Sequence, residues 1–181
     1  GWHFAVGVSA ITIYSNIDKF MLLEMKGAVE AGVYAVAYRL VSISFAPIQS
    51  LLAATYPSFF RLGSKSYDEL NSYIKAISRW TIPYGLSMVG VLIIISFYVD
   101  VIFGAQYSDS AKIVVLLAFM PLIQSYYYPY ADGLTGMGLQ SKRSRIQIFI
   151  AFLNFVMNIG FIYYFGAVGA ALSTMLSELM I

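Results

Sequence analysis

The sequence predicts an all-α integral membrane protein, a lobe of six transmembrane helices. Of its 181 residues, 60% are apolar and only 11% are charged, whereas about 25% of the residues are charged in an average soluble domain. A soluble domain of this size could not hide so much apolar surface from water. A chain of this length has room for about six helical spans of roughly 20 residues each.

Composition also excludes several classes of function. The net charge of +2 is too small for a surface that tracks nucleic-acid phosphates, so we expect no nucleic-acid partner. The chain has no cysteine and a single histidine, His3, which argues against thiolate or histidine metal sites and against a histidine-centred triad. We therefore expect no catalytic residue, no metal and no cofactor, and we leave open a coupling of function to protons or sodium ions.

Stretches with few or no charges mark the expected spans within one lobe that covers residues 1–181. These stretches are residues 2–23, 33–60, 80–99, 113–131, 146–165 and 167–181. The last stretch is too short to cross a bilayer, and the apolar character begins directly after Gly1. We therefore expect both ends to be cut from a longer chain.

The loops predict the orientation of the spans. Segments 61–79 and 139–145 carry seven basic residues, namely Arg61, Lys65, Lys75, Arg79, Lys142, Arg143 and Arg145. The loops of the opposite side carry two, Lys26 and Lys112. The positive-inside rule places the first set in the cytoplasm.

One cytoplasmic segment has the pattern of a surface helix. Ser66 and Glu69 fit a capping box at a helix start, and apolar residues then recur at Tyr67, Leu70, Ile74 and Ile77. This spacing of three and four residues predicts an amphipathic helix over residues 66–79. Such a helix can lie in the headgroup region or act as a simple packed connector.

Charged side chains inside the expected spans are the first candidate functional residues, because an ionisable group inside a membrane is costly. Asp18 and Lys19 lie near the outer end of the first span, and Arg39 lies about two turns into the second. Asp18 is about 7.5 Å of helical rise from Leu23, and Arg39 is about 9 Å from Val33. If the two spans are antiparallel neighbours, the charges lie at similar depth. They predict either an anion-attracting cavity lining or an interfacial cluster that only fixes depth.

Amide side chains extend the candidate cavity lining. Gln49, Gln124, Asn154 and Asn158 lie in otherwise apolar spans, and we count Gln49, Asn154 and Asn158 among the candidate substrate-binding residues. Asn154 and Asn158 are four residues apart and share one helix face. They predict either a polar path or hydrogen bonds that join neighbouring helices. All five prolines fall within or at the edges of spans, which predicts kinks around a central site or plain packing kinks.

Five segments occur in a recognisable order along the chain. They are residues 17–22 (IDKFML), 30–40 (EAGVYAVAYRL), 103–107 (FGAQY), 133–140 (GLTGMGLQ) and 164–174 (YFGAVGAALST), with Asn154 and Asn158 before the last. Together they resemble polysaccharide-unit flippases of the Wzx type. That family belongs to the multidrug/oligosaccharidyl-lipid/polysaccharide (MOP) superfamily, with the lipid II flippases and the MATE drug exporters.

The resemblance implies that the chain is the C-terminal half of a two-lobed transporter, beginning at the seventh span. It implies that Asp18 and Arg39 face a cationic central cavity that receives an undecaprenyl-pyrophosphate-linked oligosaccharide. Rocking of the lobes would move this headgroup across the bacterial inner membrane for O-antigen, capsule or exopolysaccharide synthesis. The implied partners are the lipid-linked oligosaccharide, the bilayer, the missing N-terminal lobe and other polysaccharide-assembly proteins.

Three alternatives stay open. Within the superfamily, the chain could come from a lipid II flippase or a MATE-type drug exporter. An integral membrane polysaccharide polymerase would need grouped acid/base or metal-binding residues in its loops, whereas the outer acidic residues Glu24, Glu30, Asp100 and Asp109 are scattered. A plain membrane anchor would not require Arg39 or the five prolines.

Overall fold

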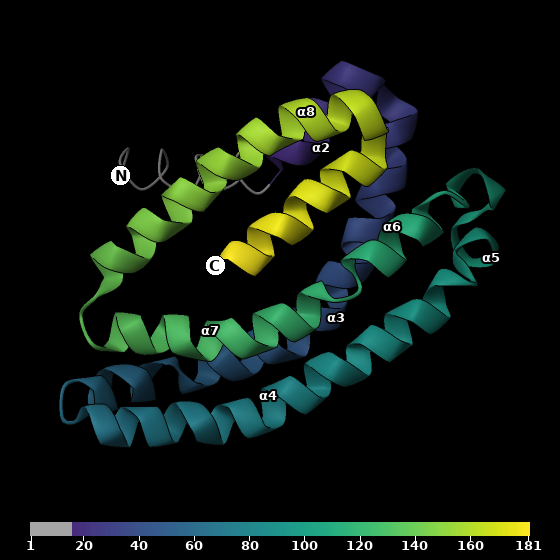
Figure 1. The fold of residues 1–181 in the computed structure, drawn as a ribbon. Coiled ribbons are helices and arrows are strands. Elements are labelled where there is room, and N and C mark those ends of the chain that lie inside the picture. Colours follow the sequence, from purple (N-terminus) through teal and green to yellow (C-terminus); the bar gives the residue numbers. More distant parts are fainter. Residues whose placement is uncertain (1–15) are drawn as a thin grey trace, which may run out of the picture.

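The computed structural model describes residues 16–181, which are almost entirely helical (Figure 1). In chain order the elements are α2 (Ile17–Lys26), α3 (Ala28–Gly63), α4 (Tyr67–Ser96), α5 (Val99–Phe103), the 3-10 turn η1 (Ala105–Tyr107), α6 (Ser110–Leu117), α7 (Met120–Gly136) and α8 (Gln140–Met180). Residues 16–181 contain no strand, so the predicted all-α class is confirmed. His3 and most of the expected first span lie outside the described residues.

Within the described residues, four helical segments are long and apolar enough to cross a membrane. They are α3, α4, the combined segment Ser110–Gly136 and α8. Large apolar side chains stay exposed along them, for example Leu86, Ile94, Ile148, Phe149 and Phe152. Apolar surface on this scale is stable only against lipid or protein. The chain is therefore an all-α integral membrane protein.

The expected surface helix over residues 66–79 is the first half of α4 and continues into the next span without a break. Ser66 caps its start, because the Ser66 hydroxyl accepts a hydrogen bond from the Asp68 amide at 3.2 Å. The apolar face of this half includes Leu70 and Ile74, which are buried in a core cluster with α3 residues such as Phe59. Protein thus covers Leu70, Ile74 and Ile77 of the amphipathic face, whereas Tyr67 at its start is exposed.

Proline explains one interruption in the helices. The expected span 113–131 is split between α6 and α7 at Ala118 and Phe119, just before Pro121 in the first turn of α7. Proline has no amide donor and clashes with the preceding turn, so it favours a break at this position. Pro47 and Pro83 instead lie within α3 and α4, which continue past them.

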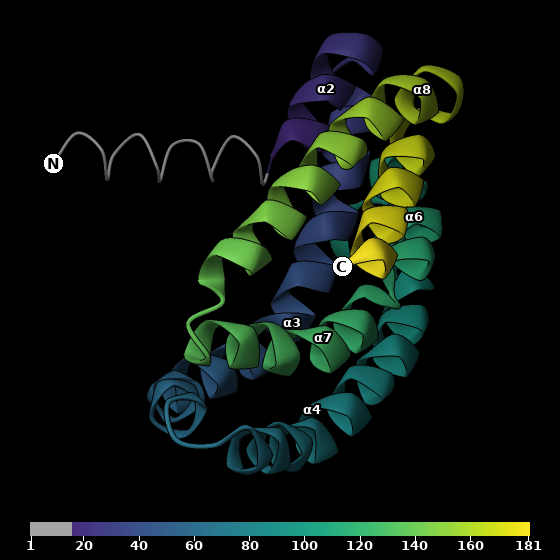
Figure 2. The ribbon, with the colours of Figure 1, turned by 60° about the vertical axis from the view of Figure 1, so that its left-hand side comes forward.

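Helix α8 contains a reversal that joins the expected spans 146–165 and 167–181. At Gly166 the backbone takes φ 57° and ψ −133°, a conformation that glycine adopts without a side-chain clash. The second leg then runs back beside the first (Figures 1 and 2). The Glu30 carboxylate accepts a hydrogen bond from the Ala167 amide at 2.8 Å, which satisfies a free donor at the start of the second leg.

The turns that follow α3 and α7 lie at the same end of the molecule, and the α2–α3 junction and the corner of α8 lie at the other (Figure 1). The first end carries the basic segments 61–79 and 139–145. There α3 and α7 are in backbone contact, since a Cβ on Gly136 would lie 2.3 Å from the Phe59 carbonyl oxygen. Glycine at this position lets the two helices approach closely.

We expect Gly136→Ala to destabilise the full-length protein by about 1 to 3 kcal/mol, because the added methyl group would force α3 and α7 apart. The matched control is Gly90→Ala in α4, where a Cβ would meet no atom within 4 Å. Removing a helix-interior glycine there should stabilise the protein by about 0.5 to 1 kcal/mol. Thermal unfolding in one detergent measures both, and equal shifts in Tm would contradict the close contact.

Candidate functional site

A cavity of about 860 Å³, here called the large cavity, lies between α2, α3, α7 and both legs of α8. Its lining includes the carboxyl groups of Asp18 and Glu178 and the amides of Gln49, Gln124 and Asn154. A second cavity of about 450 Å³, the small cavity, shares Phe45, Gln49 and Tyr128 with it and extends to Asp132 and Arg143. Polar side chains therefore line a continuous region between helices that cross the membrane.

Asp18 is fixed at one wall of the large cavity by α3. The Tyr34 hydroxyl donates a short hydrogen bond to the Asp18 carboxylate, and the Thr174 hydroxyl of α8 lies 3.1 Å from the same Tyr34 oxygen. Asp18 and Tyr34 are both buried. This chain of contacts joins α2, α3 and the second leg of α8, so the carboxylate has a defined position.

The two candidate cations lie beside the large cavity rather than in its lining. The Lys19 ammonium lies 4.4 Å from the ring centroid of Tyr38, a lining residue, and donates a hydrogen bond of 2.8 Å to Asn16. Arg39 is exposed on α3; Asp18 attracts the Lys19 ammonium, whereas Arg39 repels it. Among the described residues, no direct ion pair joins Asp18 to Arg39. The carboxylate of Asp18 thus lies in the lining, and the two cations lie at its edge.

The candidate amides of α8 hold its two legs together. Asn158 donates to Asn154 at 3.0 Å, Asn154 donates to Ser177 at 2.9 Å, and the Ser173 hydroxyl donates a short bond to Asn158. Asn158 is fully buried, whereas Asn154 also lines the large cavity. The interhelical role and the lining role that the sequence suggested therefore meet at Asn154. Gln49 is exposed and lines both cavities.

Glu178 is a lining residue that the sequence analysis missed. Its Oε1 accepts a hydrogen bond from the Gln124 amide at 3.0 Å. Tyr127 of α7, another lining residue, is a further side-chain hydrogen-bond partner of Glu178. The available signal was a lone glutamate in the otherwise uncharged stretch 167–181.

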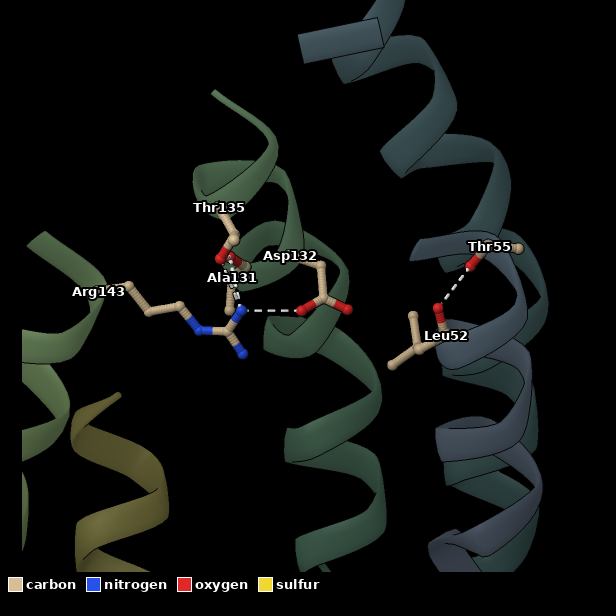
Figure 3. A network of polar contacts seen from close by, with 6 residues as sticks. All are labelled: Leu52, Thr55, Ala131, Asp132, Thr135 and Arg143. Carbon is tan, nitrogen blue, oxygen red and sulfur yellow. Dashed lines mark hydrogen bonds and ion pairs between the residues drawn. The ribbon is translucent and has the colours of Figure 1, made fainter. Parts of the chain in front are cut away.

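A second missed feature is the ion pair between α7 and the start of α8 (Figure 3). Arg143 Nη1 donates to Asp132 Oδ1 at 2.9 Å, to the Thr135 hydroxyl at 2.9 Å and to the Ala131 carbonyl at 3.1 Å. The side chains of Arg143 and Asp132 are only 17% and 10% exposed. The sequence analysis treated Arg143 as a loop charge, because spacing alone does not reveal a partner eleven residues earlier.

In sequence, the chain is similar to proteins of polysaccharide biosynthesis. Residues 1–63 match a protein family described as polysaccharide biosynthesis protein. The chain is 27% identical over 175 residues to "Probable flippase AglR" of Haloferax volcanii, which is 91% of this chain and 35% of that protein. It is 25% identical over 150 residues to "Probable low-salt glycan biosynthesis flippase Agl15" of the same organism, which is 81% of this chain and 31% of that protein.

A third relative is "Uncharacterized membrane protein MJ1375" of Methanocaldococcus jannaschii, at 24% identity over 98% of this chain and 41% of that protein. The chain spans about a third of the length of the first two relatives. No solved structure gives a significant match.

The helices and the cavity define the class, an all-α membrane protein with several spans and a cavity that carries carboxyl and amide groups. Within that class, the chain resembles the flippase-like proteins of polysaccharide biosynthesis at distant identity. The resemblance to polysaccharide flippases that the five sequence segments indicated is thereby confirmed. The names of the first two relatives describe transport rather than catalysis.

We expect Arg143→Ala to destabilise the full-length protein by about 3 kcal/mol, because it leaves the Asp132 carboxylate poorly solvated and without its partner. The matched control is Lys112→Ala, which removes the exposed pair with Asp109, whose side chains are 77% and 73% exposed. That change should cost less than about 1 kcal/mol. Thermal unfolding measures both, and a Tm shift for Arg143→Ala no larger than the control's would contradict a structural role.

Proposed function

We propose that this chain is part of a flippase that moves lipid-linked oligosaccharides across a membrane, and that it is not an enzyme. One observation carries the proposal: helices apolar enough to cross a membrane line a cavity of about 860 Å³ whose wall carries carboxyl and amide groups. The names of two relatives support the same class of function. Because the chain covers about a third of those relatives, the rest of such a protein would complete the transport path.

The physical task of such a flippase is to replace water around a sugar headgroup. Transfer of an unpaired hydroxyl group into an apolar medium costs several kcal/mol, and an oligosaccharide carries many hydroxyl groups. Amide, hydroxyl and carboxyl side chains around the large cavity offer hydrogen-bond partners at membrane depth. The lipid tail of the substrate stays in the bilayer beside the apolar helix faces.

In this proposal the candidate residues divide into two groups. Asp18, Gln49 and Asn154 contact the sugars, and Asn158 positions Asn154 through their mutual hydrogen bond. Lys19 and Arg39 form a cationic edge next to the large cavity and receive the phosphate groups of the carrier. Alternating exposure of the cavity then follows from rocking of this lobe against a second lobe.

We further propose that the carrier is undecaprenyl pyrophosphate, that the membrane is the bacterial inner membrane, and that the product is O-antigen, capsule or exopolysaccharide. The named relatives belong to archaea, so the identity of the carrier needs its own measurement. Extraction of the lipid-linked intermediates from cells and mass spectrometry of the lipid part would identify it. A carrier other than undecaprenyl would contradict this part of the proposal.

The transport function is tested in cells that lack the full-length gene. We expect lipid-linked oligosaccharide to accumulate on the cytoplasmic face, because an oligosaccharide headgroup does not cross the bilayer unaided. A membrane-impermeant sugar-modifying reagent reports which face holds the glycan. Restoration of outward display by the full-length gene supports the proposal, and normal display in its absence contradicts it.

For Arg39→Ala in the full-length protein, we expect about a tenfold loss of transport, because a charge-assisted hydrogen bond to phosphate is worth about 1.5 to 3 kcal/mol. The control is Arg61→Ala, which removes an exposed arginine at the other end of the same helix. The initial rate of outward display measures both, normalised to the amount of protein in the membrane. Full activity of the Arg39 variant would remove this residue from the mechanism.

A further inference from the structure

The charge of the large cavity is opposite to the cationic lining that the family resemblance implies. Its lining contains two carboxyl groups, Asp18 and Glu178, and no lysine or arginine from the described residues 16–181. Lys19 and Arg39 lie outside the lining. Arg143 lines the neighbouring small cavity, where Asp132 neutralises it.

Glu178 provides one carboxyl group on the wall formed by the second leg of α8. Gln124 donates to its Oε1, and the Tyr127 hydroxyl of α7 is a further side-chain hydrogen-bond partner. These two partners from α7 hold the carboxyl group at the cavity wall.

Asp18 provides the second fixed carboxylate on a different wall. Tyr34 donates to it and is itself in contact with Thr174, so the carboxylate is held at the cavity wall, with Lys19 on its outer side. Like charges placed close together outside bulk water repel strongly, and such repulsion is a common source of specificity. A sugar bearing a carboxylate would face this repulsion, whereas a neutral or amine-bearing sugar would not.

We propose that the large cavity takes the sugar part of the substrate, and that Asp18 and Glu178 select neutral or amine-bearing sugars against acidic ones. This inference rests on the proposed flippase function and names the substrate class of the same site. The phosphate groups of the carrier then lie outside the large cavity.

The test uses the full-length protein in sealed membrane vesicles and two lipid-linked oligosaccharides on the same carrier. The probes differ at one sugar, a hexose in one and the corresponding uronic acid in the other. We expect the wild-type protein to transport the neutral probe at least tenfold faster. Equal rates, or a faster rate for the acidic probe, overturn the proposal while leaving the flippase function intact. Transport of neither probe contradicts the flippase function itself.

Two variants locate the selectivity. Glu178→Gln and Asp18→Asn each remove one negative charge and keep the side-chain shape, so each should raise the rate for the acidic probe about tenfold. The control Glu24→Gln neutralises an exposed carboxylate of α2 outside the lining and should change neither rate. The amount of each variant in the membrane and its Tm show whether it is folded. If Glu178→Gln does not accumulate in the membrane, the rate of the Asp18→Asn variant alone tests the proposal. An unchanged rate for the acidic probe in correctly folded variants overturns the assignment.

Discussion

The structure depends on one constraint: a polar side chain inside an apolar bundle needs a partner within that bundle. Several inward-facing polar side chains therefore make contacts between helices. Asp18 of α2 accepts a hydrogen bond from Tyr34 of α3, Asn154 joins the two legs of α8, and Arg143 joins α8 to α7. The contact between Tyr34 and Thr174 connects α8 to α3, and these helices form walls of the large cavity.

Close backbone packing makes these polar contacts possible. Lipid chains are as apolar as the side chains, so helices in a membrane associate through dense packing and hydrogen bonds rather than through exclusion of water. Gly136 removes the side chain where α7 meets α3, and Gly166 lets α8 reverse with Glu30 covering the new helix start. The small residues therefore determine how near the helices come, and the polar residues determine in which register they remain.

Composition and charge-free stretches were sufficient to predict the all-α membrane class, because the bilayer demands long apolar helices. Spacing along one chain did not reveal which side chains meet across helices. Asp18 is held by Tyr34, a partner that the similar depth of Asp18 and Arg39 did not indicate. The partner of Arg143 depends on the turn between α7 and α8, and the role of Glu178 depends on the reversal of α8 at Gly166. An amphipathic pattern likewise does not show what covers its apolar face, and for Leu70, Ile74 and Ile77 the cover is protein.

The carboxyl groups in the lining and the cations at its edge occupy different places, and this arrangement bears on how a substrate is recognised. A lipid-linked oligosaccharide has an anionic joint between an apolar tail and a sugar head. The described residues form an apolar outer face, a cationic edge at Lys19 and Arg39, and a cavity with the carboxyl groups of Asp18 and Glu178. In the proposed flippase, these three zones would receive the tail, the phosphate groups and the sugars of the substrate. A uniformly cationic cavity would hold the phosphate anywhere along the path, whereas this arrangement favours one depth for the phosphate and leaves the sugars to hydrogen bonding. Recognition of the carrier and recognition of the glycan would then rest on different residues.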